Sequence, residues 1–104
     1  MELDVETKDG FLVDRNDWNK TIAEKIALDE AIILSDPHWE LISFVQQYYS
    51  DYHITPIMRI LAKAIRKRIS EEKGTSKYLY SLFPDAPVRQ LARIAGLPKP
   101  PSCI

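Results

Sequence analysis

The chain has 104 residues, of which 45% are hydrophobic and 28% are charged, and its formal net charge at pH 7 is −1. This length predicts one domain, and the composition excludes a disordered chain. The apolar runs fall far short of the roughly 20 residues of a membrane-spanning helix, and the acidic start argues against a secretory signal peptide. The only cysteine, Cys103, excludes a disulfide framework, and we expect a cytoplasmic protein whose thiol stays reduced.

The near-neutral net charge conceals an uneven distribution. Residues 1–55 contain twelve Asp and Glu against four Lys and Arg, a net charge of −8. Residues 56–104 contain three Asp and Glu against ten Lys and Arg, a net charge of +7. Two interpretations stay open: the basic half binds a polyanion or an acidic partner, or the two halves pair with each other within the fold.

In chain order, the first predicted elements are a β-hairpin and a helix. ELDVET and FLVD flank the turn signal KDG at 8–10. A helix is expected after Asp17, a natural N-cap residue, through about residue 31. Its apolar positions recur near helical spacing at Trp18, Ile22, Ile26 and Ile33.

Two further helices are predicted to begin with a capping residue followed by proline. One opens at Ser35, before Asp36-Pro37, and its broad apolar side suits a central core helix. The next opens at Thr55-Pro56 and is broken at Gly74. Its apolar stripe has helical spacing, at Ile57, Ile60, Leu61, Ala64 and Ile65.

The C-terminal third predicts two shorter helices and a tail. Thr75 or Ser76 caps the helix KYLYSLF, and Gly96 closes the last helix, PVRQLARIA, as a C-cap residue. The predicted fold class is mostly α (α+β), with a small N-terminal hairpin packed on about five helices. We divide the chain into one globular domain at 1–96 and an extended, mobile, Pro-rich C-terminal arm at 97–104.

Conventional catalytic and metal motifs are missing from the sequence. His38 and His53 lie far apart and no cysteine is near them, so the spacing of a zinc site is absent and structural roles are favoured. The sequence also lacks a Gly-rich phosphate loop and a GxSxG motif. These observations argue against a stand-alone catalytic pocket, and we predict no metal.

The third predicted helix carries an all-basic face opposite its apolar stripe. No acidic residue occurs from Pro56 to Ser70, which favours anion docking because Arg forms planar, paired bonds to phosphate and Lys acts as a point charge. The alternative is a solvated face that complements the acidic half. The face consists of Arg59, Lys63, Arg66 and Lys67, with Arg68 beside it.

The tail LPKPPSCI places the thiol next to the last residue. Its three prolines favour polyproline II at about 3.1 Å per residue, so the arm from Gly96 to Cys103 would reach roughly 20 Å. A thiol on a stiff arm suits a carrier that enters a partner's active site, and the alternative is an incidental cysteine. The carboxylate of Ile104 disfavours the thiolate, so the partner would have to activate Cys103.

The segment KYLYSLFPDAPVRQLARIAGLPKPPSCI resembles the DsrC/TusE family, whose pattern is KYLYxLFP, then AGLPKP and a penultimate cysteine. HWELISFVQQYY and TPIMRILAKAI extend the resemblance over nearly the whole chain. The family implies a mostly helical fold, a mobile C-terminal arm and no cofactor. Members linked to dissimilatory sulfite reduction carry a second cysteine, which aligns with Ala92. The resemblance therefore implies the single-cysteine, TusE-like branch.

In that branch the resemblance implies a sulfurtransferase, a persulfide carrier in the relay for 2-thiolation of the tRNA wobble uridine. Cys103 would accept sulfane sulfur from a TusBCD-type complex and pass it to an MnmA-type thiouridylase bound to tRNA. The basic face would meet an acidic surface of a relay partner, which we favour, or the tRNA. Candidates for orienting the tail or holding its persulfide are Lys77, Arg89, Arg93 and Lys99.

Two other functions stay open at this point. One is a DsrC-like gamma-type partner of dissimilatory sulfite reductase, against which Ala92 argues. The other is a helical nucleic-acid-binding regulator that uses the Thr55–Ile69 segment as a recognition helix. The net charge of −1 is unfavourable for an autonomous DNA-binding protein.

Overall fold

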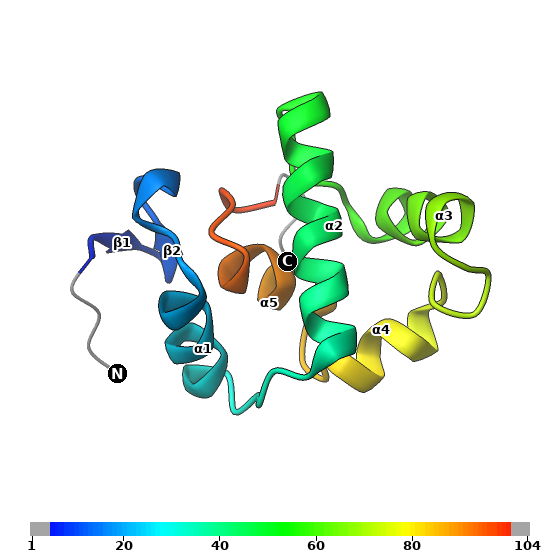
Figure 1. Cartoon of the computed structure of the whole chain (residues 1–104), viewed down its shortest axis with the longest axis horizontal. Coiled ribbons are helices and arrows are strands. Elements are labelled where there is room, and N and C mark those ends of the chain that lie inside the picture. Colours follow the sequence, from blue (N-terminus) through cyan, green and yellow to red (C-terminus); the bar gives the residue numbers. More distant parts are fainter. Residues whose placement is uncertain (1–4, 101–104) are drawn as a thin grey trace.

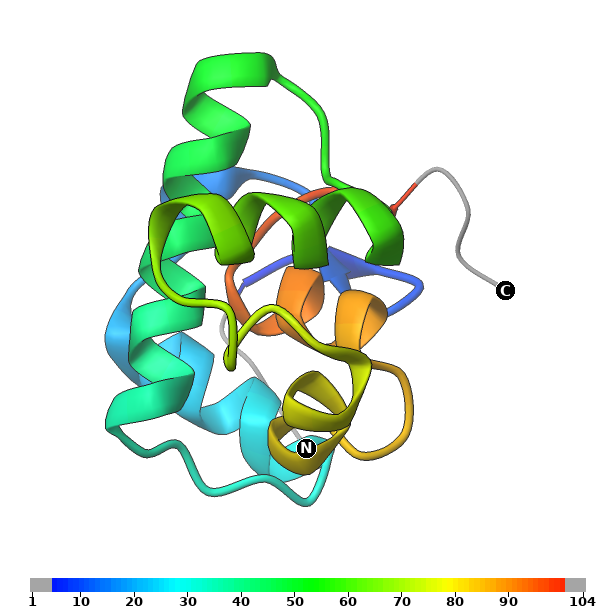
Figure 2. The same cartoon turned by 90° about the vertical axis from the view of Figure 1, so that its right-hand side faces the viewer.

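The computed structural model describes residues 5–100, which form five helices, a two-stranded antiparallel sheet and one 3₁₀ turn (Figures 1 and 2). In chain order the elements are β1 (Thr7–Lys8), β2 (Phe11–Leu12), the 3₁₀ turn (Arg15–Asp17), α1 (Lys20–Asp29), α2 (Asp36–Tyr52), α3 (Met58–Arg68), α4 (Ser76–Leu82) and α5 (Pro87–Ile94). The predicted fold class, mostly helical with a small N-terminal hairpin, is confirmed.

The hairpin forms because two turn residues adopt left-handed backbone angles. The φ values of Asp9 and Gly10 are 56° and 86°, as a two-residue type I′ turn requires. The turn pairs β1 with β2 in antiparallel register. Phe11 and Leu12 are buried, and β2 contacts α5, so the hairpin covers one side of the core.

Side-chain caps explain where α2 and α4 begin. The Ser35 N–H donates to His38 Nδ1 at 3.1 Å, and Ser35 is the predicted N-cap of α2. Thr75 Oγ1 accepts an N–H from the first turn of α4, which decides between Thr75 and Ser76. His38 also ties α2 to the end of α4, because its Nε2 donates to the Leu82 carbonyl oxygen at 2.9 Å.

Two other predicted N-caps are wrong. Asp17 lies in the 3₁₀ turn, and α1 is capped by Asn19, whose side chain accepts the Ile22 N–H at 2.8 Å. Asp and Asn are both good caps, so local sequence does not separate two candidates so close together. At the start of α3 the cap position belongs to Ile57, because the Thr55 hydroxyl donates to the C-terminal segment instead.

Ile33 does not lie on the buried side of the first helix, where its spacing had placed it. Its side chain is 83% exposed. The helix ends at Asp29, and Ala31 with a φ of 60° turns the chain, so Ile33 no longer follows the helical repeat. Ile32 takes the buried position instead.

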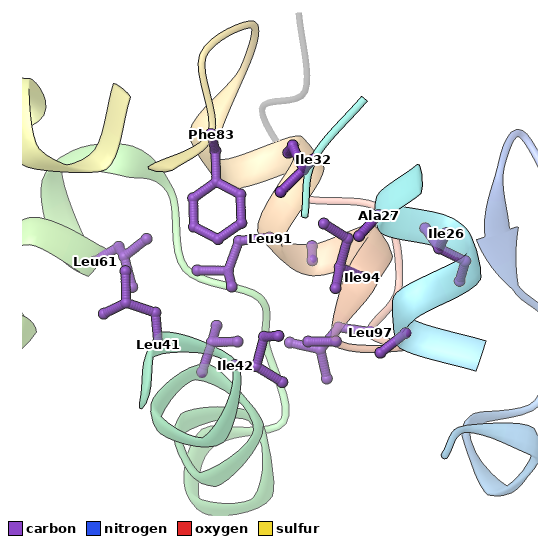
Figure 3. Close-up of a cluster of buried hydrophobic side chains, with 14 of the residues drawn as sticks. Ile26, Ala27, Ile32, Leu41, Ile42, Leu61, Phe83, Leu91, Ile94 and Leu97 are labelled. Atoms are coloured by element: carbon purple, nitrogen blue, oxygen red, sulfur yellow. The ribbon is translucent and has the colours of Figure 1, made fainter. Parts of the chain in front are cut away.

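Helix α5 is the central element of the core and contacts α1, α2, α4 and β2 (Figure 1). Its Leu91 and Ile94 side chains are completely or almost completely buried and lie between side chains of α1 and α2 (Figure 3). Burial of each such side chain is worth about 2 kcal/mol. The other elements are therefore held together largely by what they bury against α5.

A carboxylate at the end of α1 binds one face of α5. The Glu30 side chain is 9% exposed. It accepts N–H groups from Arg89 at 3.1 and 3.3 Å and from Gln90 at 3.1 Å. Arg93 donates to the same carboxylate and also pairs with Asp29 at 2.8 Å. Since residues three and four positions apart share a helix face, one carboxylate can hold this whole side of α5.

Two of these α5 side chains extend the network. Arg93 Nε donates to the Gly10 carbonyl oxygen at 2.7 Å, and a Cβ on Gly10 would lie 2.8 Å from that nitrogen. Gln90 is fully buried, and its Oε1 accepts the N–H groups of Asp85 and Ala86 at 3.2 and 3.1 Å. Side chains of α5 therefore hold both the hairpin turn and the loop that precedes the helix.

The pKa of Glu30 lies below its ordinary value. Burial opposes ionisation, but hydrogen bonds from the two arginines and Gln90, with the charge of Arg89, outweigh that effect. Because the folded pKa is depressed, the ionised carboxylate contributes stability that is fully present above the unfolded pKa of about 4.3. That contribution is lost as the pH falls through the folded pKa.

We predict that Glu30→Gln lowers the free energy of unfolding at neutral pH by about 1–3 kcal/mol, because the arginines lose their carboxylate. Urea denaturation measures this difference from wild type, which should shrink as the pH falls through the depressed folded pKa of Glu30. Glu24→Gln, at an exposed position of α1, removes the same charge and should have almost no effect. A Glu30→Gln deficit that stays constant with pH would contradict the assignment.

Candidate functional site

The C-terminal tail leaves α5 through a Schellman turn. The Leu97 N–H donates to the Ala92 carbonyl at 2.9 Å, and the Gly96 N–H donates to the Arg93 carbonyl at 3.3 Å. Gly96 has a φ of 76°, the left-handed angle that this helix ending requires. The prediction that Gly96 closes the last helix is confirmed, and this turn sets the direction in which the tail departs.

Three side chains from other parts of the fold bind carbonyl oxygens around this turn. Trp18 Nε1 donates to Ile94 at 2.8 Å, and Gln46 Nε2 of α2 donates to Ala95 at 2.9 Å. These are carbonyls at the end of a helix, which have no partner within the helix. Thr55, in the loop between α2 and α3, donates its hydroxyl to the Pro98 carbonyl at 3.1 Å. The base of the tail is thus held by side chains from three separate segments of the chain.

The globular part of the chain extends beyond the predicted boundary at residue 96. Leu97 is 1% exposed and belongs to the core, and Pro100 is also buried. The described part of the predicted arm, residues 97–100, therefore lies against the domain. Cys103, the predicted carrier residue, lies outside the described residues, as does Pro101, so the mobility of the arm at 97–104 stays a prediction.

A polar groove of about 340 Å³ lies beside the Schellman turn. Its lining includes Arg15, Trp18, Gln46 and Gly96. The Arg15 guanidinium lies 4.4 Å from the centre of the Tyr49 ring, a cation–π contact that keeps the cation at the rim. Two of the tail's anchors, Trp18 and Gln46, thus also form a wall of this groove.

The ion pairs of the structure join the acidic half of the chain to the basic half. Arg68 pairs with Asp51 at 3.8 Å and Lys73 with Glu40 at 2.8 Å, in addition to the pairs of Arg89 and Arg93. For these four basic residues, pairing within the fold is the interpretation that holds. The Lys73 and Arg68 pairs are exposed and contribute little to stability.

Arg89 and Arg93, predicted as candidates for orienting the tail or holding its persulfide, have partners on another side of α5. Both side chains bind Glu30 on the α1 side of α5, and the Arg93 side chain is only 12% exposed. They therefore hold α5, the helix from which the tail continues, against the end of α1. Arg66 of the predicted basic face donates to the Gly74 carbonyl at 2.6 Å and closes the turn after α3.

The other predicted site cations are exposed and have no ion pair within residues 5–100: Arg59, Lys63, Lys67, Lys77 and Lys99. Lys63 and Lys67 lie together on α3, beside Arg68, in a groove between α3 and α2. Lys77 is on α4 and Lys99 in the tail. The predicted set of basic residues is therefore distributed over several surfaces and does not surround one pocket.

Sequence reasoning missed the anchors Trp18, Gln46 and Thr55 as residues that position the tail. Trp18 was assigned to an apolar helix position, Thr55 to a cap and Gln46 to no role, because the partner of each lies far away in the sequence. Across residues 5–100, no group of His, Asp or Glu side chains is placed to hold a metal ion. Among the helices in that range, none is both long and apolar enough to cross a membrane.

The model of the family described as DsrC like protein matches residues 2–104. The chain belongs to the DsrC family. It is 47% identical over 95 residues to Sulfurtransferase TusE of Photorhabdus laumondii, covering 91% of this chain and 86% of that protein. It is 44% identical over 103 residues to Sulfurtransferase TusE of Escherichia coli K12, covering 99% and 94%. The prediction of a sulfurtransferase of this family is confirmed by these relatives.

Two solved DsrC structures have the same fold. The NMR structure of Allochromatium vinosum DsrC superposes with a TM-score of 0.86 at 43% identity, covering 100% of this chain and 96% of that one. The oxidised gamma-subunit of dissimilatory sulfite reductase from Archaeoglobus fulgidus gives 0.76 at 36% identity, covering 99% and 91%. Since DsrC of Allochromatium is almost as similar in sequence as the TusE proteins, identity alone does not separate the two branches.

We predict that Gly96→Ala destabilises the protein by about 1–3 kcal/mol, since alanine is strained at this φ. Its Cβ would also lie 2.6 Å from Trp18 Cδ1. Lys99→Ala, at an exposed tail position, is the control and should leave stability unchanged. Urea denaturation of the two variants measures the difference. Equal stability of Gly96→Ala and wild type would show that the turn is not constrained as described.

Proposed function

We propose that this protein is a sulfur carrier that holds sulfane sulfur as a persulfide on Cys103 and passes it on in the relay for 2-thiolation of tRNA wobble uridine. The observation that carries the proposal is the placement of the only thiol at the end of a tail whose base is bound by Trp18, Gln46 and Thr55. A fixed base followed by a short Pro-rich segment that ends in the thiol suits delivery into a partner's site. The relatives named Sulfurtransferase TusE support the same activity.

The transfer chemistry needs no oxidant or reductant. The Cys103 thiolate attacks the terminal sulfur of a donor persulfide, a new S–S bond forms on Cys103, and the donor leaves as a thiolate with the electron pair of the broken bond. In the second transfer an acceptor thiolate attacks the terminal sulfur of the Cys103 persulfide and releases the Cys103 thiolate. The Cys103 thiol therefore has to be deprotonated only for the first transfer, in which it is the nucleophile, because in the second transfer it is the leaving group.

The resemblance supports particular partners for the two transfers. A TusBCD-type complex would supply sulfur, and an MnmA-type tRNA thiouridylase with bound tRNA would accept it. Both steps use free thiols, which is consistent with a reducing cytoplasm. No metal or organic cofactor takes part in these transfers.

A second candidate function is that of a gamma-type partner of dissimilatory sulfite reductase, because DsrC structures superpose on nearly the whole chain. Ala92 argues against it. In the DsrC proteins of that pathway the resemblance places a second cysteine at this position, and the Ala92 side chain cannot act as a thiol. The two-cysteine cycle is therefore not available to this chain, and we favour the relay.

Intact-protein mass spectrometry tests the carrier role. The protein is incubated without reductant with a cysteine desulfurase, cysteine and the upstream relay proteins. We predict a gain of one sulfur atom on Cys103 and no gain in Cys103→Ser. Cys103→Ser should also abolish wobble thiolation in a strain that lacks the native protein, while urea denaturation shows an unchanged fold. Normal thiolation with Cys103→Ser would refute the proposal.

A further inference from the structure

A second groove, of about 360 Å³, lies between the C-terminal part of α2 and the outer face of α3. Its apolar part consists of Tyr48, Tyr52, Ile60 and Ala64. Tyr52 and Ile60 are 53% and 37% exposed, although large apolar side chains are usually covered in a core. An apolar hollow on the surface, rimmed by polar groups, is typical of an interaction site.

The rim of this α2–α3 groove is basic. Lys63, Lys67 and Arg68 line it, and Lys63 and Lys67 have no ion pair within residues 5–100. Arg68 faces Asp51 at 3.8 Å across two half-exposed side chains and lies 3.4 Å from the Tyr52 hydroxyl. Such an exposed pair is weak, so the rim keeps most of its positive charge. Its complement is an acidic surface.

The apolar part of the groove distinguishes a protein from an RNA partner. RNA-binding sites stack bases on open aromatic faces, whereas the rings of Tyr48 and Tyr52 pack on each other, with centres 4.6 Å apart and planes tilted by 46°. Exposed aliphatic groups, Ile60 and the nearby Ile54 at 48% exposure, gain nothing from phosphate or ribose. They do gain from an apolar side chain, as at the centre of a protein interface.

The groove and the base of the tail share one loop. Residues 53–57 join α2 to α3, the two walls of the groove, and Thr55 in this loop binds the Pro98 carbonyl of the tail. Figure 2 shows the last described residues of the tail beside the start of α3. A protein bound in the groove would therefore lie next to the base of the tail.

We propose that the α2–α3 groove docks an acidic segment of a relay partner, with one large apolar side chain between Tyr52 and Ile60 and carboxylates facing Lys63, Lys67 and Arg68. This inference rests on the proposed function. Docking and tail insertion then act as two linked attachments, so that the second occurs at a high effective concentration. The groove supplies affinity and orientation, and Cys103 supplies the chemistry.

Binding is measured by calorimetry in a Cys103→Ser background, so that docking is separated from sulfur transfer. The probes are the upstream TusBCD-type complex, the MnmA-type thiouridylase with tRNA, and tRNA alone. We predict that Lys63→Glu/Lys67→Glu weakens binding to at least one protein partner by about tenfold or more. Ile60→Ser should weaken the same binding by about threefold or more. Wild-type binding should weaken as salt rises.

The matched control is Lys8→Glu/Lys20→Glu, which makes the same change in net charge at two exposed positions. Both lie in the hairpin and α1, on the opposite side of the molecule from α3 (Figure 1). This control should bind the partner within about twofold of wild type, since it affects only long-range attraction.

Several outcomes would overturn the docking proposal. The first is that wild type and Lys63→Glu/Lys67→Glu bind the protein partners equally. The second is that Lys63→Glu/Lys67→Glu loses affinity only for tRNA. The third is that Ile60→Ser leaves partner binding unchanged although the charge reversal weakens it. Sulfur loading of Cys103 is assayed separately in the chain that retains the cysteine. If Lys63→Glu/Lys67→Glu weakens docking but wild type takes up no sulfur on Cys103, only the carrier role is refuted. If wild type is loaded but Lys63→Glu/Lys67→Glu docks as wild type does, only the groove proposal is refuted. Absence of any binding by wild type would refute the groove proposal, and the loading assay would still decide the carrier role.

Discussion

The ionised carboxylate of Glu30 is the interaction on which the arrangement of the other elements depends. It gathers N–H groups from Arg89, Gln90 and Arg93 at the surface where α1 ends on α5. Because these donors are partly or fully buried, loss of the carboxylate would leave charged and polar groups without partners, which is more costly than the net value of the bonds. Through Arg93 and Gln90 the same network fixes the hairpin turn and the loop before α5.

The fixed position of α5 sets the direction in which the C-terminal tail departs. A thiol carried by a tail reaches a partner in a reproducible direction only if the first residues of that tail are held. Here the carbonyls of Ile94, Ala95 and Pro98 are each bound by a side chain from another element. Because a helix leaves its last carbonyls without partners, these bonds satisfy groups that would otherwise need water, and they hold the first residues of the tail against the domain.

The uneven charge of the chain serves two purposes. Part of it is used inside the fold, where carboxylates of the first half meet the arginines of α5. Another part remains on α3, where Lys63 and Lys67 lie beside exposed Tyr52 and Ile60. Interior pairs contribute to the geometry of the tail, whereas surface cations steer a partner and set its register.

The sequence by itself determined the fold class, the hairpin turn at Asp9-Gly10, the start of α2 at Ser35, the end of α5 at Gly96 and the family. It also determined that the thiol at Cys103 stands in a Pro-rich tail. These features depend on residues a few positions apart. Only the tertiary structure decided that Arg89 and Arg93 bind Glu30, that Thr55 holds the tail, and that α2 and α3 form a groove. The physical reason is distance along the chain: the bonds from Thr55 to Pro98, from Trp18 to Ile94 and from Arg93 to Gly10 join residues 43, 76 and 83 positions apart, and no local pattern encodes them.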